Sequence, residues 1–167
     1  MINLKNIVLS TVIVGFVGLS LSTYAKAITA TNDYDSSKDL KIVGQDNNLN
    51  NVRDDVDEII DESVIGNPLL KTELRRYAWA LEQYMQAQTP TQIINYTYSM
   101  DAPRWCSIAL GISDDDYSEY AAIVFNQMIN TTQRKLAVAK VDMRLRNLGY
   151  VSKRMRPFSD YCEKGLI

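Results

Sequence analysis

Residues 113–149 read SDDDYSEYAAIVFNQMINTTQRKLAVAKVDMRLRNLG, and this stretch indicates the fold class. Ser113 can cap a helix, and the three aspartates that follow it favour the positive end of a helix dipole. Apolar side chains then recur three and four positions apart, which is the period of a helix with one buried face. The main members of this apolar series are Phe125, Ile129, Leu136, Ala139 and Met143.

The same stretch is compatible with one helix or with two. Asn130 and Thr131 are of the residue types that cap helices and form turns, which favours a break near them. The apolar series keeps its register through Thr132, which favours one continuous helix. An unbroken helix over residues 113–148 would be roughly 50 Å long at ~1.5 Å per residue.

The two cysteines of the chain, Cys106 and Cys162, bear on this choice. A pair of cysteines in an exported chain most often forms a disulfide, although free thiols and pairing between chains are alternatives. About fourteen residues lead from residue 148 to Cys162, so beside an unbroken helix they would have to extend back along its whole length. We therefore slightly favour the break, which folds the stretch into a hairpin.

Further helices are expected on the N-terminal side of this stretch. Helical spacing of apolar residues predicts one helix over residues 49–66 and a second from Pro68 to just before Thr89. Residues 91–100 contain β-forming side chains, but their helical neighbourhood favours a helix; we expect Asp101-Ala102-Pro103 to break the chain after it. No strand alternation is visible. We predict an all-α fold, a small bundle of three to five helices stapled by one disulfide.

The N-terminal residues have the three-part pattern of a secretory signal peptide. Lys5 precedes an apolar run over residues 7–19, and Ala25-Lys26-Ala27 has the small residues of a cleavage site. We predict a signal peptide at 1–27, a flexible acidic tail at 28–48 and a single helical domain at 49–167. The expected location is the periplasm of a bacterium or the extracellular space. The alternative is an uncleaved membrane anchor.

Charge is segregated along the chain. Residues 28–66 contain ten acids and three bases, whereas residues 134–156 contain eight bases and one acid. The basic block could contact an anionic partner, such as an acidic protein or lipid headgroups, or it could be a solvated helix face or pair internally with the acidic block. The candidate basic patch comprises Arg144, Arg146, Lys153, Arg154 and Arg156. Export and the acidic total disfavour nucleic acid as a partner.

Several site chemistries have no support in the sequence. The chain contains no histidine, which excludes Ser-His-Asp and Cys-His catalysis and histidine metal ligands. The glycines lack the spacing of a phosphate loop, and the acidic run at 54–62 lacks the glycine of a calcium loop. We therefore predict no catalytic residue, no metal and no cofactor.

One fragment suggests an enzyme. Residues 60–63 (IDES), Asn67-Pro68 and Met85-Gln86 resemble the Glu-Ser and Gly-Leu-Met-Gln signatures of lytic transglycosylases. The resemblance implies a cell-wall hydrolase in which Glu62 is the general acid. Gln83 and Tyr84 depart from the glycine and the apolar residue of that family's pattern.

We expect an exported helical protein that binds another protein or an envelope component. An inhibitor, an immunity protein and a secretion or envelope accessory factor all fit this expectation. The alternatives are a carboxylate-only cell-wall hydrolase using Glu62 or Glu82, and weak association with anionic membrane surfaces through residues 153–156. Aromatic side chains are mostly expected in the core. Four of them form a candidate aromatic interface: Tyr77, Trp79, Tyr84 and Trp105.

Overall fold

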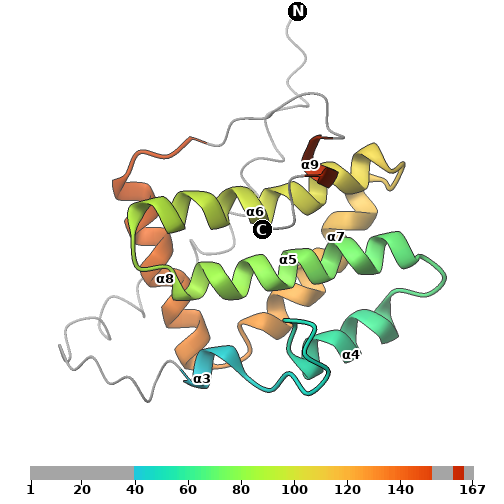
Figure 1. Cartoon of the computed structure of the whole chain (residues 1–167), viewed down its shortest axis with the longest axis horizontal. Helices are drawn as coiled ribbons and strands as arrows, with labels where there is room; N and C mark the ends of the chain where they lie inside the picture. The colour runs from blue at the N-terminus through green and yellow to red at the C-terminus, as the bar shows by residue number, and fades with distance from the viewer. Residues whose placement is uncertain (1–39, 152–159, 164–167) are drawn as a thin grey trace, which may run out of the picture. The chain divides into compact units, whose positions relative to one another are not determined.

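The computed structural model describes residues 40–151 and 160–163, and within these ranges the chain forms helices and loops but no strand (Figure 1). The five longer helices are α4 (Asp54–Ser63), α5 (Pro68–Gln86), α6 (Pro90–Ala109), α7 (Asp114–Met128) and α8 (Thr132–Asn147). Two helices of four residues, α3 (Leu40–Val43) and α9 (Asp160–Glu163), flank them. The prediction of an all-α bundle stapled by one disulfide is confirmed.

The stretch 113–149 forms two helices. The Ser113 hydroxyl accepts a hydrogen bond from the Asp116 amide at 3.0 Å and caps α7, which ends at Met128. The Thr131 hydroxyl accepts from the Arg134 amide at 3.3 Å and caps α8. Thr131 is the third residue after α7 ends, and a new helix begins directly after it. Its hydroxyl satisfies a backbone amide that would otherwise lack a partner in the first turn of α8. The break favoured by the sequence is therefore confirmed.

The disulfide joins α6 to α9. The Cα atoms of Cys106 and Cys162 are 4.9 Å apart, so the predicted pairing within one chain is confirmed. The Tyr161 ring stacks on Tyr98 with ring centroids 5.6 Å apart, and it lies 6.4 Å from the Trp105 ring. These residues form a small apolar cluster of their own, so both a covalent bond and aromatic packing hold α9 on α6.

The predicted break at Asp101-Ala102-Pro103 is wrong. α6 continues from Pro90 to Ala109 with Pro103 inside it. Proline in a helix interior removes one backbone hydrogen bond and normally kinks or ends the helix. Here Ala102 and Pro103 are buried, since α6 packs on α5, α7 and α9, and Ala102 belongs to the apolar cluster around the disulfide (Figure 1). Tertiary packing therefore compensates for the locally unfavourable residue.

The helix predicted over residues 49–66 is shorter than expected, since α4 starts at Asp54. Residues 44–53, called the 44–53 loop below, precede it in an irregular conformation with Leu49 and Asn51 at positive φ. The Asp46 carboxylate accepts hydrogen bonds from the amides of Asn50 and Asn51. Such side-chain bonds to the local backbone compete with helix formation and delay the start of α4.

Part of the segment predicted as a tail lies within the described residues. Residues 40–48 comprise α3 and the first half of the 44–53 loop, and the Ile42 carbonyl accepts a hydrogen bond from Arg134 Nε at 3.0 Å. The remainder of the predicted tail, residues 28–39, and the predicted signal peptide at 1–27 lie outside the described residues. Among the helices that the structure describes, none is long and apolar enough to cross a membrane.

The main core lies between α5 and the helices around it. α5 and α6 run side by side, α8 lies across one end of this pair, and α7 packs on α4, α5 and α6 (Figure 1). Fully buried apolar side chains come from each of these helices, which explains why each helix carries one apolar face. They include Ile60, Leu74, Leu81, Ile93, Val124, Met128 and Val141.

Candidate functional site

The acidic residues of α4 are paired with basic residues of α5. Arg75 donates to Asp57 at 2.7 Å and to Asp61 at 3.0 Å, and Lys71 donates to Asp61 at 2.9 Å. The Lys71 hydrogen bond is the main cause of a lowered pKa at Asp61. Asp57 and Asp61 therefore have their partners on α5, whereas Asp55 pairs with Arg53 of the 44–53 loop and Arg134 of the basic block acts on it only electrostatically.

Three of the five basic residues of α8, Lys135, Lys140 and Arg146, lie on the opposite side of that helix from the core. Val141 and Arg134 are buried, and the residues a half-turn away from them are exposed. We call this exposed surface the α8 outer face; its members are Lys135, Leu136, Ala139, Lys140, Met143 and Arg146. Leu136 is 37% exposed and Met143 is 50% exposed, so the face combines apolar side chains with cations.

The three cations of the α8 outer face form no salt bridge within residues 40–151 and 160–163, although Arg146 acts electrostatically on the half-buried Asp142. The ion pairs in this part of the chain involve Arg53, Lys71, Arg75, Arg76 and Arg104. No acidic side chain belongs to the face itself. It therefore presents three positive charges to its surroundings, interspersed with apolar side chains.

The predicted basic patch is only partly within the described structure. Arg146 is exposed on the α8 outer face, whereas Arg144 is half-buried and its guanidinium donates to the Ala87 carbonyl at 3.4 Å. Ala87 is the C-cap of α5, where a positive charge stabilises the helix dipole. Lys153, Arg154 and Arg156 lie outside the described residues. The prediction from sequence did not include Lys135 and Lys140. Their helical spacing from Arg146 could have identified them.

Of the four residues in the predicted aromatic interface, two are buried and two are half-buried. Tyr84 is 2% exposed and donates its hydroxyl hydrogen to Asp142 at 2.7 Å, and Trp105 is buried beside the disulfide. Tyr77 and Trp79 are half-buried, and Trp79 meets Tyr96 edge to face with centroids 6.4 Å apart. The structure thus places Tyr84 and Trp105 among the packing residues of α5 and α6, and it does not bring the four together into one surface.

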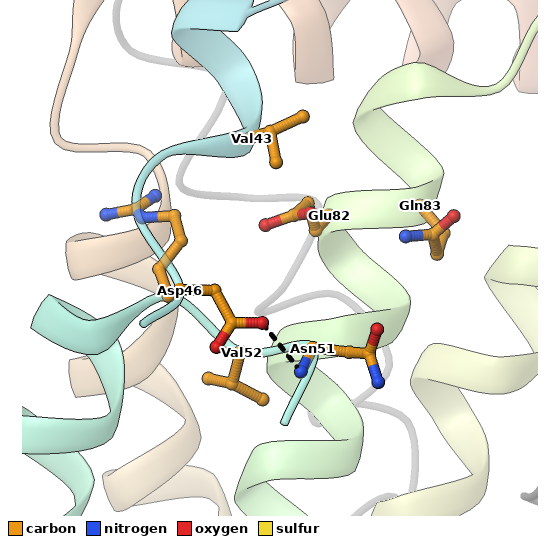
Figure 2. Close-up of a pocket in the computed structure, with 7 residues that line it drawn as sticks. Val43, Asp46, Asn51, Val52, Glu82 and Gln83 are labelled. Carbon is orange, nitrogen blue, oxygen red and sulfur yellow. Dashed lines mark hydrogen bonds between the residues drawn. The ribbon is translucent and has the colours of Figure 1, made fainter. Parts of the chain in front are cut away.

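The two candidate carboxylates differ in their surroundings. Glu62 is exposed on α4, whereas Glu82 is 9% exposed on α5 and lines a cavity of about 120 Å³. Figure 2 shows Glu82 projecting from α5 towards the segment that carries Val43 and Asp46. The other lining residues are Asn51, Val52, Arg53 and Gln83. Burial raises the pKa of Glu82 to about 7, with Arg53 and Arg134 opposing the shift and Asp46 adding to it.

Arg53 and Arg134 anchor the wall of this cavity. Arg53 is 2% exposed and makes a two-pronged contact with Asp55 at 2.9 and 2.6 Å, and it also donates to the Met128 and Gln127 carbonyls. Arg134 donates to the Asn130 side chain at 2.7 Å and to the Ile42 carbonyl. Both guanidinium groups are therefore engaged in holding α3 and the 44–53 loop against the α7–α8 connection.

The described structure defines a class of protein: an all-α bundle with one intramolecular disulfide, a basic outer helix and a small acidic cavity. No known protein family matches the chain, and neither the curated proteins nor the solved structures compared with it include a similar one. Its function is therefore inferred from its own geometry and charge.

Proposed function

We propose that this chain is an exported interaction protein whose α8 outer face binds an acidic surface of another protein. The observation that carries the proposal is the set of three exposed cations, Lys135, Lys140 and Arg146, which form no ion pair within the described residues. An unneutralised basic surface attracts an anionic partner and accelerates its association.

The apolar side chains of the face support a protein as the partner. Leu136 and Met143 lie among the cations, and methionine and arginine are both enriched at protein interfaces. The basic block could instead pair internally with the acids of α4, but the ion pairs that these acids make go to Arg53, Lys71 and Arg75 and not to α8. This leaves the charges of α8 for an external partner.

Export rests on the signal-peptide pattern of residues 1–27 together with the disulfide. Disulfides persist in the periplasm and outside the cell, and they are rare in the cytosol. The Cys106–Cys162 bond is therefore consistent with export. Fractionation of the native cells, with detection of the mature chain beginning at Ile28, tests this part of the proposal.

The experiment is affinity capture from the native envelope with matched variants. A triple variant K135Q/K140Q/R146Q removes the three cations, and T72E/T91E/N95E changes the net charge equally at exposed sites on α5 and α6. We expect an acidic protein to bind the wild type and the control in equal molar amounts, and binding to the triple variant to be lost. Raising the salt concentration from about 50 to about 300 mM should weaken the complex.

Three results would overturn the proposal. Equal capture by the triple variant and the control would show that the α8 outer face is not the contact. Sedimentation with anionic vesicles, but not with neutral ones, in the absence of any protein partner would favour the membrane alternative. Turnover of peptidoglycan that is lost in Glu82→Gln would favour the hydrolase alternative.

A further inference from the structure

The Glu82 carboxylate lacks a partner in an otherwise well-satisfied neighbourhood. It is 9% exposed and lines the cavity between α5 and the 44–53 loop. Within the described residues, no hydrogen bond or ion pair reaches its oxygen atoms. The side chain is largely buried, but its oxygens are not among the fully enclosed atoms without a hydrogen-bond partner, so a ligand or counter-charge entering the cavity can reach them.

The neighbouring arginines do not supply that partner. Arg53 directs its guanidinium at Asp55 and at two carbonyl groups, and Arg134 directs its own at Asn130 and Ile42. They act on Glu82 only through space. Their two positive charges are offset by Asp55 and Asp46, so an ionised Glu82 leaves one negative charge in excess in this group of side chains.

The cavity walls indicate what can neutralise this charge. Asp46 and Glu82 both line the cavity, and the Asn51 and Gln83 amides add polar lining (Figure 2). Val43 and Val52 provide apolar lining. The two carboxylates can bind a cation, and the apolar walls can contact a short alkyl chain. An alkylammonium group has both of these parts.

The size of the cavity sets the limit on the ligand. A volume of about 120 Å³ holds several water molecules, since one water needs ~10–15 Å³ of space on this measure. The pockets that enclose drug-sized molecules measure about 300–1,000 Å³. The cavity therefore has room for the end of one side chain or for a very small amine, and not for a sugar chain.

We propose that the cavity between α5 and the 44–53 loop binds one alkylammonium group, with Glu82 and Asp46 as its counter-charges and Val43 and Val52 around its alkyl stem. The group belongs either to a free small amine or to a lysine side chain of a bound peptide. The site is separate from the α8 outer face, so it stands independently of the proposed function.

Binding of a cation should be coupled to the protonation of Glu82. The charged groups that act on it are Arg53, Arg134 and Asp46, and burial keeps its pKa at about 7 in the empty cavity. A bound ammonium favours the ionised carboxylate, so binding releases a proton when the cavity is occupied below that pH. Affinity should therefore rise as the pH increases from about 6 to about 8.

The test is calorimetric titration of the full chain with methylammonium chloride and with the peptide N-acetyl-Gly-Lys-Gly-amide. We expect saturable binding of both probes, with proton release measured by comparing buffers of different ionisation enthalpy. Glu82→Gln should weaken binding at least about tenfold, since it removes a charge-assisted hydrogen bond. Glu62→Gln, which alters an exposed carboxylate on α4, is the matched control and should bind as the wild type does.

The outcomes distinguish the two sources of the ammonium group. Peptide binding at least about tenfold tighter than methylammonium binding identifies a lysine side chain as the ligand, and equal or weaker peptide binding identifies a free amine. The proposal is overturned if neither probe saturates, if Glu82→Gln binds as tightly as the wild type, or if the wild type at about pH 6 binds without releasing a proton. The last measurement needs no variant, so the test does not depend on the folding of Glu82→Gln.

Discussion

Three buried charged side chains lie where the 44–53 loop meets α5, α7 and α8. Arg53, Glu82 and Arg134 are each less than a tenth exposed. Burying charge is costly unless each group is paired, and only the two arginines have hydrogen-bonding partners among the described residues. Stability at this place therefore depends on the protonation of Glu82 and on the close packing of Arg53.

The pH dependence of stability should report the burial of Glu82. Its pKa is raised from 4.5 to about 7, so between these values the native state holds a proton that the unfolded chain has lost. Wild-type stability therefore falls through this window and levels off above it, by about 3 kcal/mol in total for this group. Glu82→Gln has no carboxylate to ionise, so its free energy of unfolding does not fall in this way. The free energy of unfolding of the variant minus that of the wild type should therefore increase with pH.

Urea unfolding at about pH 5 and about pH 8 measures this effect. Glu73 and Asp142 also have pKa values raised by burial, so the informative quantity is the difference between wild type and variant at each pH. Glu62→Gln should show no such growth. A constant difference between wild type and Glu82→Gln would show that Glu82 is not protonated in the native state.

Gly44 should tolerate no side chain. Its φ is +81°, and a Cβ atom there would lie 2.6 Å from Arg53 Cδ and 3.0 Å from an Arg134 nitrogen. Gly44→Ala should cost about 1–2 kcal/mol for the left-handed backbone and about 1–3 kcal/mol more for displacing Arg53. Gly66→Ala has a similar φ of +74° and open space around it, so it should show only the first cost. Equal unfolding free energies for the two variants would contradict this account.

At the scale of helices, the α7–α8 connection depends on a cap. The Thr131 hydroxyl accepts from the Arg134 amide, and Thr132, the next residue, makes no cap bond. Thr131→Ala should therefore lower the free energy of unfolding by about 1 kcal/mol, while Thr132→Ala should change it by less than about 0.5 kcal/mol. Chemical denaturation of the two variants checks this, and equal effects would argue against the cap.

The elements differ in how far local sequence predicts them. The break before Thr132 was predictable because cap residues act within a few positions of themselves. The continuation of α6 through Pro103 was not, because it depends on burial against α5, α7 and α9. The late start of α4 was also missed, since hydrogen bonds from Asp46 to the backbone of the 44–53 loop override the apolar spacing there.

The candidate site was predictable only in part, for a related reason. Glu82 could be named by residue type, but its burial depends on a loop about thirty positions earlier in the chain. The basic patch was chosen by counting charges along the sequence and so included Arg144, which instead contacts the Ala87 carbonyl. Helical register, applied to residues 135–146, would have grouped Lys135 and Lys140 with Arg146.

At the scale of the whole molecule, the disulfide closes a long loop. Cys106 and Cys162 are 56 positions apart, and the loop contains α7 and α8. In the chain-entropy model, replacing both cysteines by alanine should lower the free energy of unfolding by about 4 kcal/mol. Reduction of the wild type should have a similar effect on urea unfolding. A variant as stable as the oxidised protein would show that packing of Tyr161 alone holds α9.

The contacts of Arg53 and Arg134 have a consequence for the order of assembly. Arg53 bonds to carbonyls 74 and 75 positions later in the chain, and Arg134 bonds to one 92 positions earlier. Ribosomes make the N-terminal end first, so residues 40–53 emerge well before the helices on which they dock. These contacts, and the position of the 44–53 loop that they fix, can therefore form only after α8 has been synthesised, near the end of translation.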